Sequence, residues 1–242
     1  MRNNATIAPF MALVLAFATL HGVVFPARAG NLGYCTVGGV ALEHARFDKA
    51  VEYFTLCIDE ADLDEDQLIA ALRARAFAYE EIGEIKKAIE DINRLIEIEP
   101  DDPMYYINRG VTLLRHGFGT LAVTDFDRAI ELNPTDAEPY FLRGLAEYEI
   151  GQAVEAIADF DQAILLDPSD PDYYVHRGHA YVEIGKYDTA ISDYGRALAR
   201  DPLNAKIYVR RGIVYKMIGD DENSTNDLMR ALELDPNSLL QP

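Results

Sequence analysis

Residues 103–136 read PMYYINRGVTLLRHGFGTLAVTDFDRAIELNPTD, and the segments 137–170 and 171–204 repeat this pattern in the same register. Four sets of small or rigid residues recur at intervals of 34. They are Gly110, Gly144, Gly178 and Gly212; Ala122, Ala156 and Ala190; Pro100, Pro134, Pro168, Pro202 and Pro236; and Gly83, Gly117, Gly151, Gly185 and Gly219. A constant period of this length is typical of a stacked repeat architecture, and it predicts the fold before any single residue does.

Each repeat is expected to form two helices joined by a tight turn. In the repeat 137–170, the segments 138–150 and 153–166 both place apolar side chains at helical spacing. Gly151 lies between them, where one helix ends and the chain reverses, and Pro168 is expected to stop the second helix. A hairpin of this kind closes its core only by stacking on the next one. An aspartate or asparagine stands before the first helix of four repeats, as an N-cap does: Asp102, Asp136, Asp170 and Asn204.

This pattern resembles the tetratricopeptide repeat. The matching residues of 103–136 are Tyr106, Gly110, Leu113, Ala122, Phe126, Ala129 and Pro134, and those of 171–204 are Tyr174, Gly178, Tyr181, Ala190, Tyr194, Ala197 and Pro202. The resemblance implies an all-α solenoid over residues 30–242, a right-handed superhelix of about six helical hairpins. The repeats are expected at 31–64, 69–102, 103–136, 137–170, 171–204 and 205–238. Because the family is a general protein-binding scaffold, the resemblance predicts the fold more sharply than the function.

The resemblance also implies where a partner binds, because the first helix of each repeat lines an inner groove in this family. The matching positions are Arg73, Phe77, Glu80, Ile107, Asn108, Val111, Leu114, Arg115, Phe141, Leu145, Tyr148, Glu149, Asp172, Val175, His176, His179, Val182, Glu183, Val209, Arg210, Ile213 and Lys216, with Lys206 and Met217 beside them. Apolar residues on the outward side of a helix favour a partner there. The alternative is that several of them only pack against the next repeat.

Some relatives hold a C-terminal carboxylate with a set of lysines and asparagines in this groove. The chain has Asn108 but lacks the lysines in the neighbouring repeats, so that specific function is not supported. The basic residues Lys206, Arg210 and Lys216 contrast with the acidic middle of the chain, and they could orient an acidic peptide segment.

Two charged residues recur at the same interval. Arg75, Arg109, Arg143, Arg177 and Arg211 fall in the first helices, and Asp91, Asp125, Asp159, Asp193 and Asp227 fall in the second helices. They could form an arginine ladder that binds a ligand, or repeated ion pairs that hold the helices in register. Because each arginine has a matching acid, we favour the structural interpretation.

One polar set stands out on the first helix of the repeat 171–204. Asp172, His176, His179 and Glu183 are spaced four, three and four residues apart, which puts them on one side of a helix. Such a set could bind zinc or copper, or respond to pH through the histidines. The simpler interpretation is a polar patch on the groove, and we predict neither a metal site nor a cofactor.

Residues 1–29 read as a secretory signal, with a charged start at Arg2, an apolar stretch, and small residues at Ala27 and Ala29 before the expected cleavage site. The alternative is a membrane anchor, but the apolar run is short and interrupted by prolines, so it would span a bilayer poorly. We therefore predict a periplasmic or secreted protein that does not span the membrane after cleavage.

The two cysteines, Cys35 and Cys57, both lie in the first, degenerate repeat, where Ala45 replaces the turn glycine. One falls early in the first helix and the other late in the second, so an antiparallel hairpin brings them level. An exported chain with an even cysteine count favours a disulfide. The alternative is a pair of buried thiols. The acidic segment 62–67 that follows is expected to be a solvated loop.

The last repeat leaves two interpretations open. Its second helix is unusually polar at residues 223–226, which could cap the end of the stack. Alternatively, Leu228, Met229 and Leu232 could contact a second copy of the chain, which would make a homo-oligomer.

Composition narrows the function classes. The chain has 242 residues, with 41 acidic and 22 basic side chains and a net charge of −19, which disfavours binding to a nucleic acid backbone. No phosphate-binding glycine loop, nucleophile elbow or metalloprotease signature is present, so we expect no catalysis. We predict a scaffold or adaptor of the bacterial envelope that binds a peptide or protein segment. The alternative is a self-assembling structural protein that acts through its end repeats and convex face.

Overall fold

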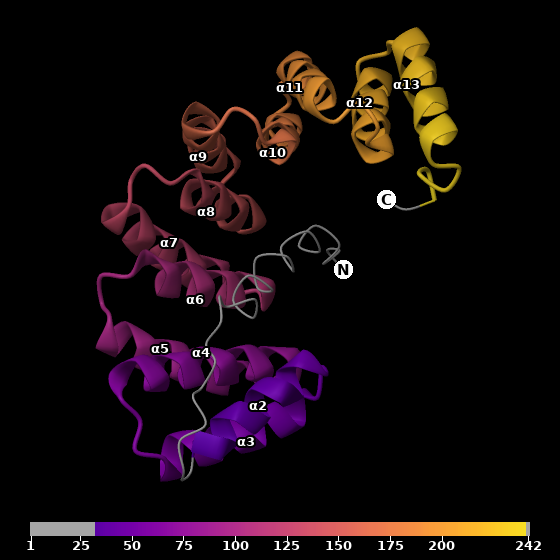
Figure 1. Cartoon of the computed structure of the whole chain (residues 1–242). Coiled ribbons are helices and arrows are strands. Elements are labelled where there is room, and N and C mark those ends of the chain that lie inside the picture. The colour runs from indigo at the N-terminus through magenta and orange to yellow at the C-terminus, as the bar shows by residue number, and fades with distance from the viewer. Residues whose placement is uncertain (1–31, 241–242) are drawn as a thin grey trace. The chain divides into compact units, whose positions relative to one another are not determined.

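The computed structural model describes residues 32–240, and the predicted signal at 1–29 lies outside them. The described residues form twelve helices and no strand (Figure 1). In order these are α2 (Leu32–Glu43), α3 (Phe47–Glu60), α4 (Glu65–Glu81), α5 (Ile85–Ile98), α6 (Pro103–Arg115), α7 (Gly119–Leu132), α8 (Ala137–Glu149), α9 (Ala153–Leu166), α10 (Pro171–Glu183), α11 (Tyr187–Arg200), α12 (Ala205–Met217) and α13 (Asp221–Leu234). The prediction of an all-α chain of paired helices is confirmed.

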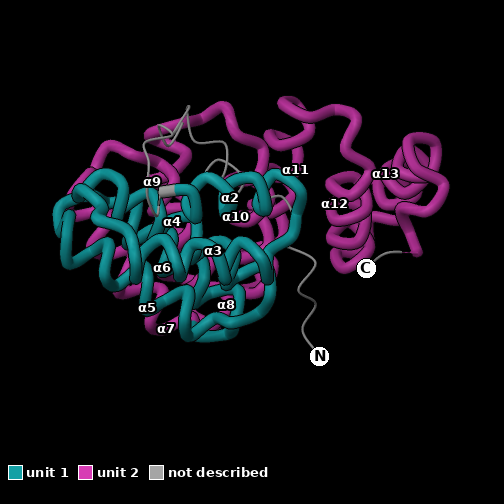
Figure 2. The backbone as a smooth tube through the Cα atoms, turned by 60° about the horizontal axis from the view of Figure 1, so that its bottom comes forward, with its two compact units in different colours: residues 1–118 teal, residues 119–242 magenta. Residues whose placement is uncertain are grey.

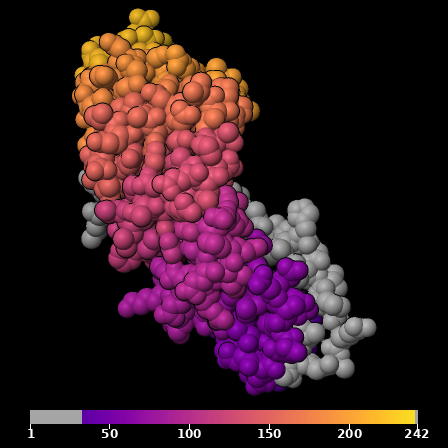
Figure 3. All heavy atoms as spheres, turned by 90° about the vertical axis from the view of Figure 1, so that its left-hand side faces the viewer, coloured from indigo at the N-terminus to yellow at the C-terminus, as the bar shows by residue number. Residues whose placement is uncertain are grey.

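The chain divides into two compact units, unit 1 up to Phe118 and unit 2 from Gly119 onward (Figure 2). In unit 1 the packed helix pairs are α2 with α3, α3 with α4, α4 with α5, and α5 with α6. Unit 2 continues in the same way from α7 with α8 to α12 with α13. Figure 3 shows one side of this unit as a continuous surface whose colour runs from pink to yellow. Contact between consecutive helices is the arrangement of a solenoid, in which each hairpin is stabilised by its neighbours.

Capping and turn residues explain where the helices begin and end. The side chains of Asp102, Asp136, Asp170 and Asn204 each accept a hydrogen bond from the backbone N–H two residues further on, at the start of α6, α8, α10 and α12. The five turn glycines all have φ between 75° and 85°, a left-handed conformation in which glycine costs least. Ala45 takes this conformation in the first turn with φ 51°, so that turn is strained.

The acidic segment after α3 differs from the expectation of a loop over 62–67. Helix α4 begins at Glu65, because Asp64 accepts a hydrogen bond from the backbone N–H of Gln67 at 2.9 Å. The side chain of Gln67 in turn accepts one from the backbone N–H of Asp64 at 3.2 Å. This capping box makes the second half of the segment the first turn of a helix.

Small residues in the first helix let an aromatic ring of the second helix lie against the backbone. A Cβ added to Gly144 would lie 2.7 Å from the ring of Phe160, and one added to Gly178 would lie 2.8 Å from the ring of Tyr194. Both rings are almost completely buried. The recurrence of glycine at this position is therefore a packing requirement of the hairpin.

Within residues 32–240, no helix combines the length and apolar character needed to cross a bilayer.

Candidate interaction site

The recurring arginines join the two helices of a hairpin. The guanidinium groups of Arg75, Arg143, Arg177 and Arg211 each donate two hydrogen bonds, of 2.6–2.8 Å, to both carboxylate oxygens of Asp91, Asp159, Asp193 and Asp227, respectively. Two parallel bonds to one carboxylate hold the orientation as well as the distance. The interpretation of these residues as ion pairs that set helix register is confirmed for these four repeats.

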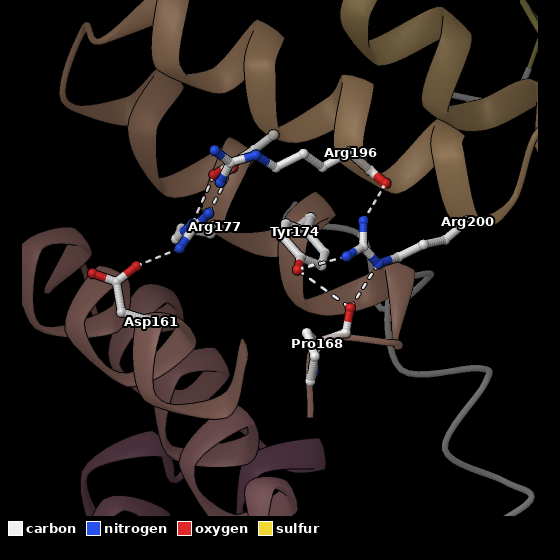
Figure 4. A network of polar contacts seen from close by, with 7 residues as sticks. Asp161, Pro168, Tyr174, Arg177, Arg196 and Arg200 are labelled. Atoms are coloured by element: carbon white, nitrogen blue, oxygen red, sulfur yellow. Dashed lines mark hydrogen bonds and ion pairs between the residues drawn. The ribbon is translucent and has the colours of Figure 1, made fainter. Parts of the chain in front are cut away.

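Four of the arginines also bind the preceding hairpin; for Arg75 the contact runs from Nη1 to the Thr55 hydroxyl at 3.2 Å. Nη1 of Arg143 donates to Asp127 at 2.6 Å, and Nη1 of Arg177 donates to Asp161 at 2.5 Å (Figure 4). In unit 1, Nη1 of Arg109 donates to Asn93 at 2.6 Å. Because these guanidinium groups are used within the framework, they are not the basic groups that a partner would meet.

A second framework contact uses Arg200 on α11. Its guanidinium carbon lies 4.1 Å from the ring centroid of Tyr174, Nη2 donates to the Tyr174 hydroxyl at 2.9 Å, and Nε donates to the Pro168 carbonyl at 2.6 Å (Figure 4). These contacts bind the end of α11 to the start of α10 and to the loop before it.

In unit 1, part of the predicted groove belongs to the core. Ile107, Val111 and Leu114 are buried, whereas Arg73, Phe77, Glu80, Asn108 and Arg115 are half-buried. The half-buried residues partly bind one another and their neighbours. Nη1 of Arg115 lies 4.0 Å from Oε2 of Glu80, the hydroxyl of Thr112 donates to Glu80, and the ring of Phe77 lies 5.8 Å from that of Phe47.

Two of these unit 1 residues have polar groups that are buried away from water. Burial raises the pKa of Glu80, although the hydrogen bond from Thr112 and the charge of Arg115 act in the opposite direction. The side-chain nitrogen of Asn108 is buried and has no hydrogen-bond acceptor among the described residues. A buried donor without a partner is costly, and a bound ligand could relieve that cost.

In unit 2, the predicted residues lie along the first helices α8, α10 and α12. Phe141 and Val175 are buried; Leu145, Tyr148, Asp172, His176, His179, Val182, Val209 and Arg210 are half-buried; Glu149, Glu183, Ile213 and Lys216 are exposed. Ile213 and Met217 on α12 expose 50% and 52% of their surface, which is high for large apolar side chains. This part of the site therefore offers apolar surface that the described residues do not cover.

The two histidines of α10 form an aromatic cluster. The His176 ring centroid lies 5.4 Å from that of Phe141, 6.2 Å from that of Phe160 and 5.4 Å from that of His179. The His179 ring lies 5.7 Å from that of Tyr194 on α11. Edge-on and tilted contacts of this kind are the geometry that aromatic rings prefer.

Burial favours the neutral form of both histidines. Burial, with a smaller contribution from the positive charge of Arg210, lowers the pKa of His176 to about 4. The same causes and the neighbouring His176 lower the pKa of His179 well below its usual range. Nε2 of His179 is buried and makes no hydrogen bond within residues 32–240.

Arg210 is the positive charge that acts on both histidines. It is half-buried on α12 and, unlike its neighbour Arg211, makes no ion pair or hydrogen bond with the described residues. Lys206, Arg210, Ile213 and Met217 are spaced four, three and four residues apart, so they share one face of α12.

The possible metal site on α10 finds no support in the geometry. The part of the chain that the structure describes contains no group of three or more His, Cys, Asp or Glu side chains placed to hold a metal ion. His176 and His179 face aromatic rings, whereas Glu183 is exposed.

Sequence reasoning missed Glu147 on α8. Its position, counted in steps of 34, is occupied by Tyr79, Leu113, Tyr181 and Tyr215 in other repeats, so the register was the available signal. Burial and then the charge of Asp159 raise the pKa of Glu147 to about 8. Oε2 of Glu147 is buried without a hydrogen-bond partner, and the protonated carboxyl of Glu147 can donate a hydrogen bond to the Asp159 carboxylate.

The two cysteines meet as expected. The Cα atoms of Cys35 and Cys57 are 5.2 Å apart, within the range found for disulfides, and both side chains are fully buried between α2 and α3.

Sequence profiles of repeat proteins match several segments of the chain. A profile described as a TPR repeat matches residues 144–185 and 178–219. Two profiles described as tetratricopeptide repeats match residues 126–158 in one case, and residues 74–102 and 205–238 in the other. No curated protein sequence matches the chain.

Solved structures share the fold at low sequence identity. MamA aligns with a TM-score of 0.64 and 23% identity, over 68% of this chain and 96% of MamA. MamA from Desulfovibrio magneticus RS-1, from residue 41 to its end, aligns with a TM-score of 0.63 and 21% sequence identity. The alignment covers 71% of this chain and 95% of that protein. YrrB, a TPR protein with an unusual peptide-binding site, aligns with a TM-score of 0.61 and 19% sequence identity. The alignment covers 78% of this chain and 96% of YrrB. These similarities confirm an all-α solenoid.

Proposed function

Because the chain belongs to the tetratricopeptide repeat family, we propose that it is an adaptor that binds a peptide or protein segment along the first helices of its hairpins. The observation that carries the proposal is the face of α12. Ile213 and Met217 expose large apolar surface there, next to a half-buried Arg210 without an acidic partner. Exposed apolar surface beside an unpaired charge is costly in a free protein and is useful at an interface.

The similarity to YrrB supports the same proposal at the level of the fold, because that protein has a peptide-binding site. The similarity is too low to transfer its residues. The site proposed here therefore rests on the side chains of α8, α10 and α12 in this chain.

A peptide library displayed on phage tests the proposal. Selected peptides should lose at least about tenfold in affinity for the Ile213→Asp variant, since a charge at the centre of an apolar contact costs well over 1 kcal/mol. The matched control is Leu165→Asp on α9, which replaces a side chain that is 74% exposed but lies on a second helix. Equal losses in both variants, or no enriched peptide, would contradict binding along the first helices.

We further propose that the adaptor works in the bacterial envelope, after export and with Cys35 and Cys57 joined. The signal-like residues 1–29 and the close approach of the two cysteines support this. Intact mass spectrometry of protein taken from an envelope fraction should show a chain without residues 1–29 and without a thiol that can be alkylated. A full-length chain with two free thiols would contradict export.

Self-assembly is the second candidate, and one observation on α13 favours it. Leu198 on α11 is 6% exposed, whereas Leu232, at the same register on α13, is 39% exposed, and Met229 beside it is 58% exposed. In the earlier hairpins of unit 2 the next hairpin covers this apolar face. In the last hairpin the face stays exposed, as an interface with a second copy would require.

Light scattering after size-exclusion chromatography separates the two candidates. If self-assembly is the function, Leu232→Glu should convert an oligomer into a monomer, while Leu165→Glu should leave it unchanged. A wild-type chain that stays monomeric at high micromolar concentration would leave only the adaptor proposal.

A further inference from the structure

Two of the described helices, α2 and α13, lack a neighbour on one side. Elsewhere the second helix of each hairpin packs on the first helix of the next, as α3 does on α4, α5 on α6, α7 on α8, α9 on α10 and α11 on α12. Among the described residues, no helix precedes α2 and none follows α13. The open sides of α13 and α2 therefore correspond to the two halves of a junction that recurs within the chain.

One pair of positions meets at every such junction. The arginine of a first helix donates from Nη1 to a side chain of the preceding second helix, at distances of 2.5–3.2 Å: Arg75 to Thr55, Arg109 to Asn93, Arg143 to Asp127 and Arg177 to Asp161. At the α11–α12 junction the second-helix position is Gly195, where a Cβ would lie 3.6 Å from Nη1 of Arg211. These two positions therefore show which residues face each other when one hairpin stacks on the next.

On α2 and α13 the same two positions hold apolar residues. Counted in steps of 34, the position of Gly195 is occupied on α13 by Met229. The arginine position is occupied on α2 by Val37, which lies as far before the turn residue Ala45 as Arg211 lies before Gly219. Met229 is 58% exposed and Val37 is 44% exposed. The polar pair of the internal junctions is thus replaced by an apolar residue on both open sides.

A second pair of residues gives the same result. Val40 on α2 has the register of Val214 on α12, yet Val40 is 47% exposed and Val214 is 3% exposed. Leu232 on α13 has the register of Leu198 on α11, and the two are 39% and 6% exposed. Val214 and Leu198 belong to one buried cluster that joins α11 to α12. The α2 end face (Val37 and Val40) and the α13 end face (Met229 and Leu232) therefore carry the residues that such a cluster would bring together.

The charge of α2 also suits a second copy of the chain. Charged residues make up 26% of the sequence and the net charge is −19, so most surfaces of two copies repel each other. Residues 32–42 contain no charged side chain, and Glu43 at the end of α2 is its only one. On α13, Asp227 is already paired with Arg211 at 2.7 Å. Contact between the two end faces therefore avoids much of the repulsion that a contact elsewhere would meet.

From these observations we propose that copies of the chain associate head to tail, with the α13 end face of one copy packed on the α2 end face of the next. The contact has the register of the α11–α12 junction, so Met229 lies against Val37 and Leu232 packs with Val40. The inference rests on the self-assembly given above as the second candidate function, and it names the partner surface. Because the two end faces differ, the contact is heterologous, and each added copy presents a new end face until the row closes into a ring.

Two variants, each blocking one end face, test the arrangement by sedimentation velocity. A contact between single helices is smaller than a standard interface of about 1,600 Å², so the chains are compared at about 5–300 μM. Val37→Asp and Met229→Asp should each weaken assembly at least about tenfold, since each puts a charge into an apolar contact. Mixed in equal amounts, the two variants should form a dimer and nothing larger. The intact α13 of Val37→Asp then meets the intact α2 of Met229→Asp, and both outer end faces are blocked.

A double variant tests the register of the contact. Val37→Arg combined with Met229→Asp gives the end faces the two residues that join α7 to α8, where Arg143 donates to Asp127 at 2.6 Å. This chain should assemble at least about tenfold more tightly than Met229→Asp alone, and its assembly should weaken as salt is raised. Val154→Asp is the control, because Val154 is a 65% exposed valine on α9, away from both end faces. It should assemble as the wild type does.

The outcomes distinguish this inference from the function on which it rests. If Leu232→Glu disperses the wild-type assembly but Val37→Asp does not, α13 contacts a surface other than α2, so self-assembly stands and the head-to-tail contact is wrong. A mixture of the two single variants that stays monomeric, or a double variant no better than Met229→Asp, overturns it as well. A wild-type chain that is monomeric throughout removes both proposals. Unchanged thermal unfolding of the variants would show that their effects come from the end faces and not from the fold.

Discussion

The hairpins α10–α11 and α12–α13 have the same framework residues but are held to different degrees. Arg177 binds Asp193 in its own hairpin and Asp161 in the preceding one, and it is 10% exposed. Arg211 binds only Asp227 and is 22% exposed, because the residue that would supply the second acid is Gly195. The motif alone thus does not determine how firmly a hairpin is held. The residue 16 positions earlier, in the neighbouring hairpin, decides it.

The comparison is tested most strongly by removing the acid of each hairpin. Asp193→Ala leaves Arg177 buried with one exposed partner, and we expect a loss of about 3–5 kcal/mol in the free energy of unfolding. Asp227→Ala should cost about half as much, since Arg211 is closer to solvent. Urea unfolding followed by far-ultraviolet circular dichroism measures both, and similar losses would show that the second ion pair is unimportant.

The next largest effect on stability is expected at the first-helix glycines that lie against side chains of the second helix. Gly178→Ala places a methyl group 2.8 Å from the ring of Tyr194, which is 1% exposed and cannot move aside, so it should cost about 2 kcal/mol. Gly212→Ala meets Leu228 at 3.2 Å, and this half-buried side chain can shift. The gain of up to about 1 kcal/mol from alanine in a helix should make that change nearly neutral. Thermal unfolding of the two variants checks the difference, and a larger loss for Gly212→Ala would contradict it.

A pH-dependent effect extends the comparison to α8, where Glu147 replaces the tyrosine found at Tyr181 and Tyr215. In the folded protein the pKa of Glu147 is raised from about 4.5 to about 8. Below pH 4.5 the carboxyl is neutral in both the folded and the unfolded chain, so it does not lower the stability of the fold. As pH rises through 8 the unfolded chain has already lost this proton, and the folded state loses stability. Glu147→Gln stays neutral and should be more stable than the wild type by about 1–2 kcal/mol at pH 8.5 and equal to it at pH 4.5. Melting temperatures at both values test this, with the exposed Glu183→Gln on α10 as control.

The smallest expected effect comes from adding the missing acid. Gly195→Asp gives Arg211 a second carboxylate, because the Cβ position at residue 195 lies 3.6 Å from Nη1 of Arg211. Gly195→Ala is the reference, because it removes the helix penalty of glycine without adding a charge. After correction for the lower helix propensity of aspartate relative to alanine, we expect Gly195→Asp to have a free energy of unfolding about 0.5–1 kcal/mol higher than that reference. The excess should vanish in an Arg211→Gln background. If it persists there, the second ion pair is not its cause.

Much of the fold could be read from spacing, since caps, turn glycines and the arginine–aspartate pairs depend on residues close in the sequence. The start of α4 could also have been found, because Gln67 stands three residues after Asp64 as in a capping box. Burial was harder to predict. Ile107 and Val209 occupy the same register, yet the first is buried and the second half-buried, because the packing neighbours differ.

The chemistry of the candidate site was the least accessible part. The sequence shows that His176, His179 and Arg210 exist, but not that an arginine lacks an acid or that an imidazole nitrogen lacks a partner. Both are properties of the whole neighbourhood, which includes residues from α8, α9 and α11. The groove prediction named the residues of this cluster and remains a prediction for binding.

The glycine at residue 195 also has a consequence for the order in which unit 2 comes apart. An array of hairpins loses its weakest junction first, and the junction between α11 and α12 has one ion pair fewer than that between α9 and α10. Slow opening should therefore begin at α12–α13, which carries Arg210 and the exposed apolar residues. A partner that bridges α10 and α12 would close this joint, so binding and local rigidity would rise together.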